Sequence, residues 1–282
     1  ELISKGVNAF GFSFGVSVFY PIQRTNVHGI GLMRRLGVVL GWAFLGISLE
    51  AYAQKPSPTL SIPTFDRPGI ADAPYTPARG SFQVELGTGL SGRVQSGRHQ
   101  EAKLLKPAVL LRYAQSAGFE WRAQWNYAPP LGSLDDYLTR NQTQLLAMGA
   151  KVRCGKEQGW LPDWGLMGNL VIDPRYASNQ EQGKPLGGDL YLVTMHNLPY
   201  GLSINTNGGL GWFPSSSSLV PVGAVAVNWA PGGPWGFFGE VYAFGGGGQA
   251  VQKGWDTGLT YLLDRDKAQI DLSWMDSDLS QK

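Results

Sequence analysis

Cysteine is almost absent from this chain, because Cys154 is the only one in 282 residues. A single cysteine cannot form a disulfide within the chain, and it excludes a zinc site built from several thiolates. Histidine is nearly as scarce: only His99 and His196 occur after residue 53, and no cluster of carboxylates accompanies either one. We therefore expect no metal site and no cofactor.

Charged residues are also few, at 16% of the chain, and their balance excludes a further class of protein. The first 53 residues hold four of the 23 basic and two of the 21 acidic residues, so the remainder carries 19 of each. Without a basic excess or a basic patch, nucleic acid is not an expected partner.

Long apolar runs are missing as well. The longest, Leu36–Leu49, has fourteen residues, whereas a membrane-spanning helix needs about 20. It follows Met33-Arg34-Arg35 and ends near Ala51-Tyr52-Ala53. A charged start, a short apolar middle and small residues at the end are typical of a secretory signal peptide; the alternative is a buried or stop-transfer helix.

This pattern divides the chain into four parts. We expect 1–32 to be an upstream, non-native extension outside the fold, and 33–53 to be the signal peptide, cleaved near Ala53. Residues 54–80 are rich in proline and show no periodicity, so we expect a poorly ordered lead-in. Residues 81–282 are then the folded domain.

What the sequence has in abundance is glycine, with 39 residues, and two-residue periodicity after Gly80. In "GFEWRAQWNY" (118–127), Phe119, Trp121 and Trp125 alternate with Glu120, Arg122 and Gln124. Because successive side chains of a strand point to opposite faces, the segment predicts a strand with one apolar and one polar face.

Similar segments recur, most of them about ten residues long, with short and long connections between them. This pattern is typical of an outer-membrane β-barrel. Such barrels have even strand counts, so we expect an all-β, antiparallel transmembrane barrel of about 12 strands, of which eleven are recognisable and the last is missing or misread. The eleven are 81–90, 104–114, 119–127, 142–154, 164–172, 189–198, 202–213, 220–229, 235–244, 255–263 and 268–274.

Periodicity alone does not decide between a soluble barrel with an apolar core and a membrane barrel with a polar lumen. Two features favour the membrane barrel. Large aromatic residues lie near strand ends and predict an interfacial girdle of Trp125, Tyr127, Trp212, Trp229, Trp235, Trp255 and Trp274. The opposite faces carry polar and charged residues of both signs, which predict a lumen lined by Arg112, Glu120, Arg122, Gln124, Asn126, Asn205, Glu240 and Asp271.

The order of the segments resembles the outer-membrane family of proposed transporters of the meta-pathway of phenol degradation. The similarity lies in 67–87 ("RPG…YTPARGSFQVELG"), 110–127, 161–172, 198–212 and 256–274. It implies a barrel that passes small, often apolar, molecules and names no substrate. In that family the chain continues through one more strand, whereas this one ends on "SWMDSDLSQK", which again predicts a missing strand.

The function we expect is therefore a channel or transporter in a bacterial outer membrane, for small and apolar or aromatic molecules. Its expected partners are outer-membrane lipid and an unidentified solute, and the oligomeric state is left open. We expect no enzyme, because His196 lacks a recognisable nucleophile and third partner for a hydrolase site. The alternatives are a closed structural or binding barrel and a soluble periplasmic β-domain.

Overall fold

The computed structural model describes residues 8–21, 66, 70–95, 98–99, 103–125, 146–172, 186–212, 219–245, 251–264 and 267–278. No helix among them is long and apolar enough to cross a membrane. The strands are β1 (Asn8–Pro21), β2 (Ser81–Gln95), β3 (Arg98–His99), β4 (Lys103–Ser116), β5 (Phe119–Trp125), β6 (Leu146–Gly155), β7 (Asp163–Ile172), β8 (Leu186–Asn197), β9 (Leu202–Trp212), β10 (Val220–Trp229), β11 (Trp235–Phe244), β12 (Gln252–Asp264) and β13 (Ala268–Asp278).

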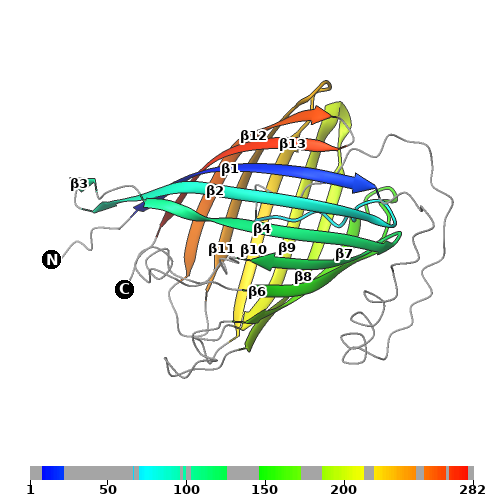
Figure 1. The fold of residues 1–282 in the computed structure, drawn as a ribbon, viewed down its shortest axis with the longest axis horizontal. Coiled ribbons are helices and arrows are strands. Elements are labelled where there is room, and N and C mark those ends of the chain that lie inside the picture. Colours follow the sequence, from blue (N-terminus) through cyan, green and yellow to red (C-terminus); the bar gives the residue numbers. More distant parts are fainter. Residues whose placement is uncertain are drawn as a thin grey trace, which may run out of the picture.

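These strands form one antiparallel sheet that closes into a barrel (Figure 1). From β4 to β13, each strand pairs with the next one in the chain, and β4 pairs with β2. The ring is closed by β1, which pairs with β13 on one side and with β2 on the other. Because β3 is a two-residue piece attached to β2, twelve long strands surround the lumen, as expected.

All eleven strands predicted from the sequence are present, with bounds that shift by a few residues. Their alternation of apolar and polar residues was therefore a sufficient signal for strand structure. The predicted signal peptide at 33–53 lies outside the described residues, as do 54–65 and 67–69 of the predicted lead-in and the predicted strand ends 126–127, 142–145 and 213.

The twelfth strand corrects two expectations. It is β1, from the segment that sequence reasoning placed outside the fold, and it fills the position expected for a strand missing at the C-terminal end (Figure 1). Asn8–Pro21 pairs with Ser81–Val94, and Asn8–Val18 pairs with Ala268–Asp278. The segment "NAFGFSFGVSVFYP" has the same two-residue period as the other strands, which is a strand signal.

The two ends of the barrel differ in their connections. Short turns join β4 to β5, β8 to β9, β10 to β11, and β12 to β13 at one end, which we call the short-turn end. The longer connections, such as those from β5 to β6 and from β7 to β8, leave from the other end. This alternation is the one expected for a transmembrane barrel.

The faces of the barrel wall are the reverse of those of a soluble β-domain. Charged and amide side chains are buried on the inner face, among them Gln83, Glu85 and Lys151. The outer face exposes large apolar residues at alternate strand positions, which include Leu86, Leu111, Leu166, Leu170, Leu190, Leu192, Val225, Val227, Phe237 and Val241. An apolar exterior around a polar interior is the arrangement of a transmembrane β-barrel.

Two neighbouring glycines of β9 show how tightly the wall is packed on its inner side. A Cβ atom added to the inward-facing Gly209 would lie 2.2 Å from the carbonyl oxygen of Leu190 and 2.6 Å from Cδ1 of Tyr191. A Cβ atom added to Gly208, on the outer face, would meet nothing within 4 Å. Glycine at 209 is therefore required by the close approach of β8.

Candidate functional site

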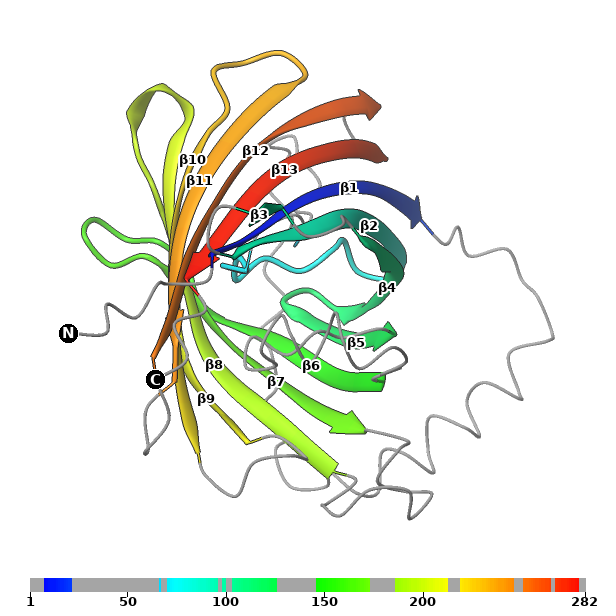
Figure 2. The same ribbon diagram turned by 90° about the vertical axis from the view of Figure 1, so that its left-hand side faces the viewer.

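The lumen contains a segment of the chain itself. Residues 70–80 run through the interior of the barrel before they enter β2 (Figure 2). Asp66 is also buried there, against basic side chains of the wall. We call Asp66 and residues 70–80 the plug. The expectation of a poorly ordered lead-in over 54–80 is therefore wrong for these residues, because polar groups of the barrel wall bind them.

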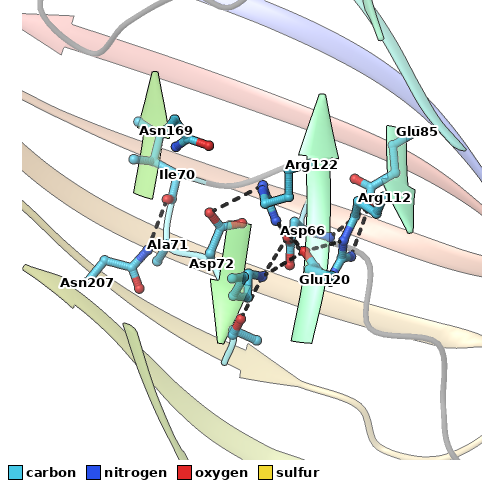
Figure 3. Close-up of polar contacts among 12 residues, drawn as sticks. Asp66, Ile70, Ala71, Asp72, Glu85, Arg112, Glu120, Arg122, Asn169 and Asn207 are labelled. Carbon is cyan, nitrogen blue, oxygen red and sulfur yellow. Dashed lines mark hydrogen bonds and ion pairs between the residues drawn. The ribbon is translucent and has the colours of Figure 1, made fainter. Parts of the chain in front are cut away.

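Asp66 is the most highly connected residue of the plug (Figure 3). Its carboxylate forms ion pairs with three basic side chains of the wall: Arg122, Lys151 at 2.7 Å and Arg112 at 3.4 Å. Its backbone N–H donates to Oε1 of Glu85, at 3.3 Å. The carboxylate of Asp66 thus joins strands β4, β5 and β6, and its backbone N–H adds β2.

The same basic residues also pair with carboxylates of the wall. Arg112 donates to Glu120 from two nitrogens, at 3.0 and 2.8 Å, and to Glu85 at 3.2 Å. Arg122 lies 3.0 Å from Glu120. Because these side chains are almost completely shielded from water, each charge depends on its partners for stabilisation. Removing one partner from such a network is expected to cost about 3–5 kcal/mol.

The middle of the plug binds the opposite wall. Glu240 of β11 accepts hydrogen bonds from the backbone N–H groups of Ile70, at 2.8 and 3.0 Å, and of Ala71. Ala71 also belongs to an apolar cluster on the inner faces of β7, β8, β10 and β11, against which Ile70 packs. The wall residues of this cluster are Met167, Tyr191, Val193, Val222, Ala224, Ala226, Tyr242 and Phe244.

Near the short-turn end, the wall binds the end of the plug mainly through Tyr75. Its hydroxyl donates to Asp163, at 2.6 Å, and its ring lies under the guanidinium of Arg153, 4.7 Å from the ring centroid. Arg112 donates to the carbonyl of Tyr75, at 3.2 Å. Lys151 donates to the carbonyl of Ala73, at 2.9 Å. The plug is thus held along its length by non-covalent contacts only.

The two carboxyl groups of the plug differ in their protonation. Burial on its own would raise the pKa of Asp66, but the charges of Arg112, Lys151 and Arg122 outweigh burial and hold that pKa well below its ordinary value. For Asp72, burial and the negative charge of Asp66 raise the pKa to about 7, although Arg122 lies 3.8 Å away. Asp72 is therefore the plug group that titrates near neutral pH.

Tyr75 is the third titratable group of the plug with a shifted pKa. Burial, followed by the hydrogen bond to Asp163, raises its pKa to about 12. The phenol therefore remains protonated at any physiological pH and keeps donating to Asp163.

Most of the residues predicted to line the lumen do face it. Arg112, Glu120, Arg122, Asn205, Glu240 and Asp271 are all buried on the inner face. Gln124 is partly buried and shares the face of Glu120 and Arg122 on β5, whereas Asn126 lies outside the described residues. Arg112, Glu120, Arg122 and Glu240 form one connected site with the plug, and Asp271 bonds instead with Gln269, 2.5 Å away.

The residues predicted to form an aromatic girdle are exposed on the outer face where the structure describes them. They are Trp125, Trp212, Trp229, Trp235, Trp255 and Trp274, while Tyr127 is outside the described residues. Five of them lie within three residues of a strand end, but Trp274 pairs with Phe12 and Thr257, nearer to mid-strand. That they mark the membrane interface remains a prediction.

Sequence reasoning missed Lys151 and Asp66, although each had a signal. In β6, Lys151 and Arg153 are charged residues on the face that also carries Ala147 and Gly149, which marks an inward position that needs a partner. Asp66 and Asp72 are carboxylates in a proline-rich segment with no helix or strand signal. Only the fold brings these groups together, because the contact between Asp66 and Lys151 spans 85 residues.

The residues considered for other chemistry lie away from the plug. His196 is near the end of β8, with Nδ1 2.9 Å from Oε1 of Glu157. Cys154 is exposed on β6. Among the described residues, no group of three or more His, Cys, Asp or Glu side chains is placed to hold a metal ion. A hollow of about 770 Å³ borders β9–β13, but Val225, Val241, Trp255 and most other lining residues face outward, so it is a groove in the outer wall.

Comparison with known proteins adds no assignment. No model of a known protein family matches the chain, and no curated protein matches it either. The fold and the plugged lumen therefore define the class of protein, a closed twelve-stranded transmembrane β-barrel.

Proposed function

We propose that this barrel is an outer-membrane channel for small apolar or aromatic molecules, and that its plug closes the channel at rest. The observation that carries the proposal is the position of the plug, which crosses the lumen and is held there by non-covalent contacts only. A segment bound in this way is able to leave the lumen without breaking any strand pairing of the wall.

The inner wall supports the choice of solute. Beside the plug, β7, β8, β10 and β11 present apolar side chains that include Met167, Tyr191 and Tyr242. Binding sites for small molecules are mostly apolar with a few placed polar groups. Sugars and inorganic ions gain little from such a wall, whereas an aromatic or alkyl group replaces the contacts of Ile70 and Ala71.

The outer wall supports the location. Its exposed leucines, valines and aromatics match the lipid-facing band of outer-membrane barrels. The resemblance to proposed phenol-pathway transporters agrees with a location in that membrane.

A closed barrel without transport is the second candidate, and one observation favours it. The carboxylate of Asp66 pairs with three buried basic side chains of the wall, so opening the lumen requires that these tightly held pairs be separated. In that case the plug is a permanent part of the interior.

Solute entry into proteoliposomes separates the two candidates. Vesicles carrying the full chain would be tested for the entry of benzamide, a neutral aromatic solute, and of erythritol, with protein-free vesicles as the blank. We expect protein-dependent entry of benzamide that exceeds that of erythritol and that increases in an Asp66→Asn variant. Absence of protein-dependent entry in both proteins would leave the closed barrel as the better account.

A further inference from the structure

One row of the barrel wall brings several side-chain oxygens together inside the lumen. The antiparallel register places Asn205 of β9 opposite Ala226, Ala226 opposite Glu240, and Glu240 opposite Asp256 of β12. All four residues are buried and face inward, with exposed fractions of 7% or less. Glu240 and Asp256 are direct neighbours in this row, whereas Asn205 is two strand spacings, about 10 Å, from Glu240.

This wall lacks internal positive charge. The inward-facing positions of the described parts of β9–β13 include Glu240, Asp256 and Asp271 but no lysine or arginine. The wall of β4–β6, by contrast, places Arg112, Arg122 and Lys151 beside its carboxylates. Like charges on directly opposed residues of neighbouring strands are destabilising. The pair Glu240 and Asp256 therefore favours a positively charged occupant.

Unused acceptor atoms point to the same occupant. Oδ1 of Asp256 and Oδ1 of Asn205 are both buried and make no hydrogen bond in the structure. Glu240 already accepts from the backbone N–H groups of Ile70 and Ala71, so it does not neutralise its neighbour. Buried acceptors without donors are costly, and a ligand that supplies several N–H groups removes that cost.

We propose that this row binds the ammonium group of a small organic amine with an apolar body. An ammonium group has three donors and no acceptor, which matches the neighbouring carboxylates of Asp256 and Glu240. Phe238 and Tyr242 precede and follow Glu240 on the same inner face and add aromatic surface for the cation and for the body of the ligand. The inference rests on the proposed passage of small molecules and narrows their class to amphipathic amines.

The competition at Glu240 gives this site a second consequence. An ammonium group that takes the carboxylate of Glu240 displaces the N–H donors of Ile70 and Ala71, so amine binding weakens the docking of the plug. The amine thus promotes its own passage, because ligand binding shifts an equilibrium toward the state that binds it better.

Calorimetric titration of the purified full chain tests the site. The probe is 2-phenylethylamine, and its control is 2-phenylethanol, which has the same shape without the charge. Both are titrated into the unaltered chain and into Asp66→Asn, in which the plug is weakened and the row is accessible. We expect the amine to bind at least about tenfold more tightly than the alcohol, a difference typical of one charge-assisted hydrogen bond.

Two variants show whether a preference for the amine arises at the inner or the outer face of the wall. Asp256→Asn keeps the shape of the side chain and is expected to reduce the preference for the amine to about twofold or less. Asp276→Asn makes the same change on the outer face, opposite Trp255, and is expected to keep the preference. The proposal is overturned if neither the unaltered chain nor Asp66→Asn prefers the amine, which is the result expected when the two carboxylates share a proton. It is also overturned if Asp256→Asn keeps the preference.

The outcome is distinguishable from failure of the proposed function. An amine preference that depends on Asp256, without any solute entry into vesicles, would refute transport and leave the site standing. Benzamide entry without an amine preference would refute the site and leave the channel standing.

Discussion

Replacement of Asp66 by asparagine should release the plug while leaving the barrel folded. Asp66 pairs with Arg112, Arg122 and Lys151, and loss of one partner from a buried ion-pair network costs about 3–5 kcal/mol. The wall avoids this cost when the plug leaves, because water then reaches the three cations, and no strand pairing involves Asp66. A weakening of about 3 kcal/mol raises the ratio of undocked to docked plug about 150-fold, since each 1.36 kcal/mol is a factor of ten.

The position of the plug can be followed by thiol labelling. Cys154→Ser removes the single cysteine, and Ala71→Cys places a new thiol at a buried plug position. In the Asp66→Asn background, we expect a membrane-impermeant maleimide to label this thiol at least about 100-fold faster. The increase is smaller only if labelling reaches the rate of a fully undocked plug. Asp276→Asn, on the outer face, serves as the control and should leave the rate unchanged. Labelling that differs by less than twofold in a folded Asp66→Asn barrel would refute the role of Asp66 as an anchor.

Three further predictions test other parts of the structure. The pKa of Asp72 is raised to about 7 in the docked plug, so its contribution to docking is complete below its ordinary pKa of 3.8 and is lost as the pH rises through 7. The labelling rate at position 71, corrected for thiol ionisation, should therefore rise about 30-fold between about pH 5.5 and 8.5. In Asp72→Asn, this rate should not change with pH in the same range. Gly209→Ala should lower the urea midpoint of the folded barrel by the equivalent of about 1–3 kcal/mol, because its Cβ would overlap Leu190, whereas Gly208→Ala should have no effect. Val16→Pro should abolish the gel-mobility difference between unheated and boiled protein, because proline removes a ladder donor between Leu86 and Ile270, and Val16→Ala should retain it.

Periodicity explains why so much of the barrel was predictable. In β5, Glu120, Arg122 and Gln124 alternate with Trp121, Ala123 and Trp125, and this pattern alone assigns both the strand and its inward face. The eleven recognised strands rest on the same signal. Which face meets lipid was decided by the structure, since Arg112 and Glu120 are buried while Leu111 and Trp121 are exposed.

The misassigned segments show that periodicity does not reveal which distant parts of the chain come into contact. β1 has the correct pattern, but a signal-like sequence follows it, and its partners in β2 and β13 are at distant places in the chain. The plug is held by side chains of the wall rather than by strand pairing, so its sequence shows no two-residue periodicity. Asp66 and Glu240 acquire their roles only when the barrel closes around the plug.

The central claim is that a segment of the chain closes a transmembrane barrel, and electrical conductance across a planar lipid bilayer tests it most directly. The unaltered chain would be compared with the double variant Asp66→Asn, Glu240→Gln, which weakens the plug at both walls. The account predicts that the unaltered protein is closed for most of the recording with brief openings, and that the double variant is open for most of it. Equal conductance of the two proteins, or no conductance from a folded double variant, would contradict it.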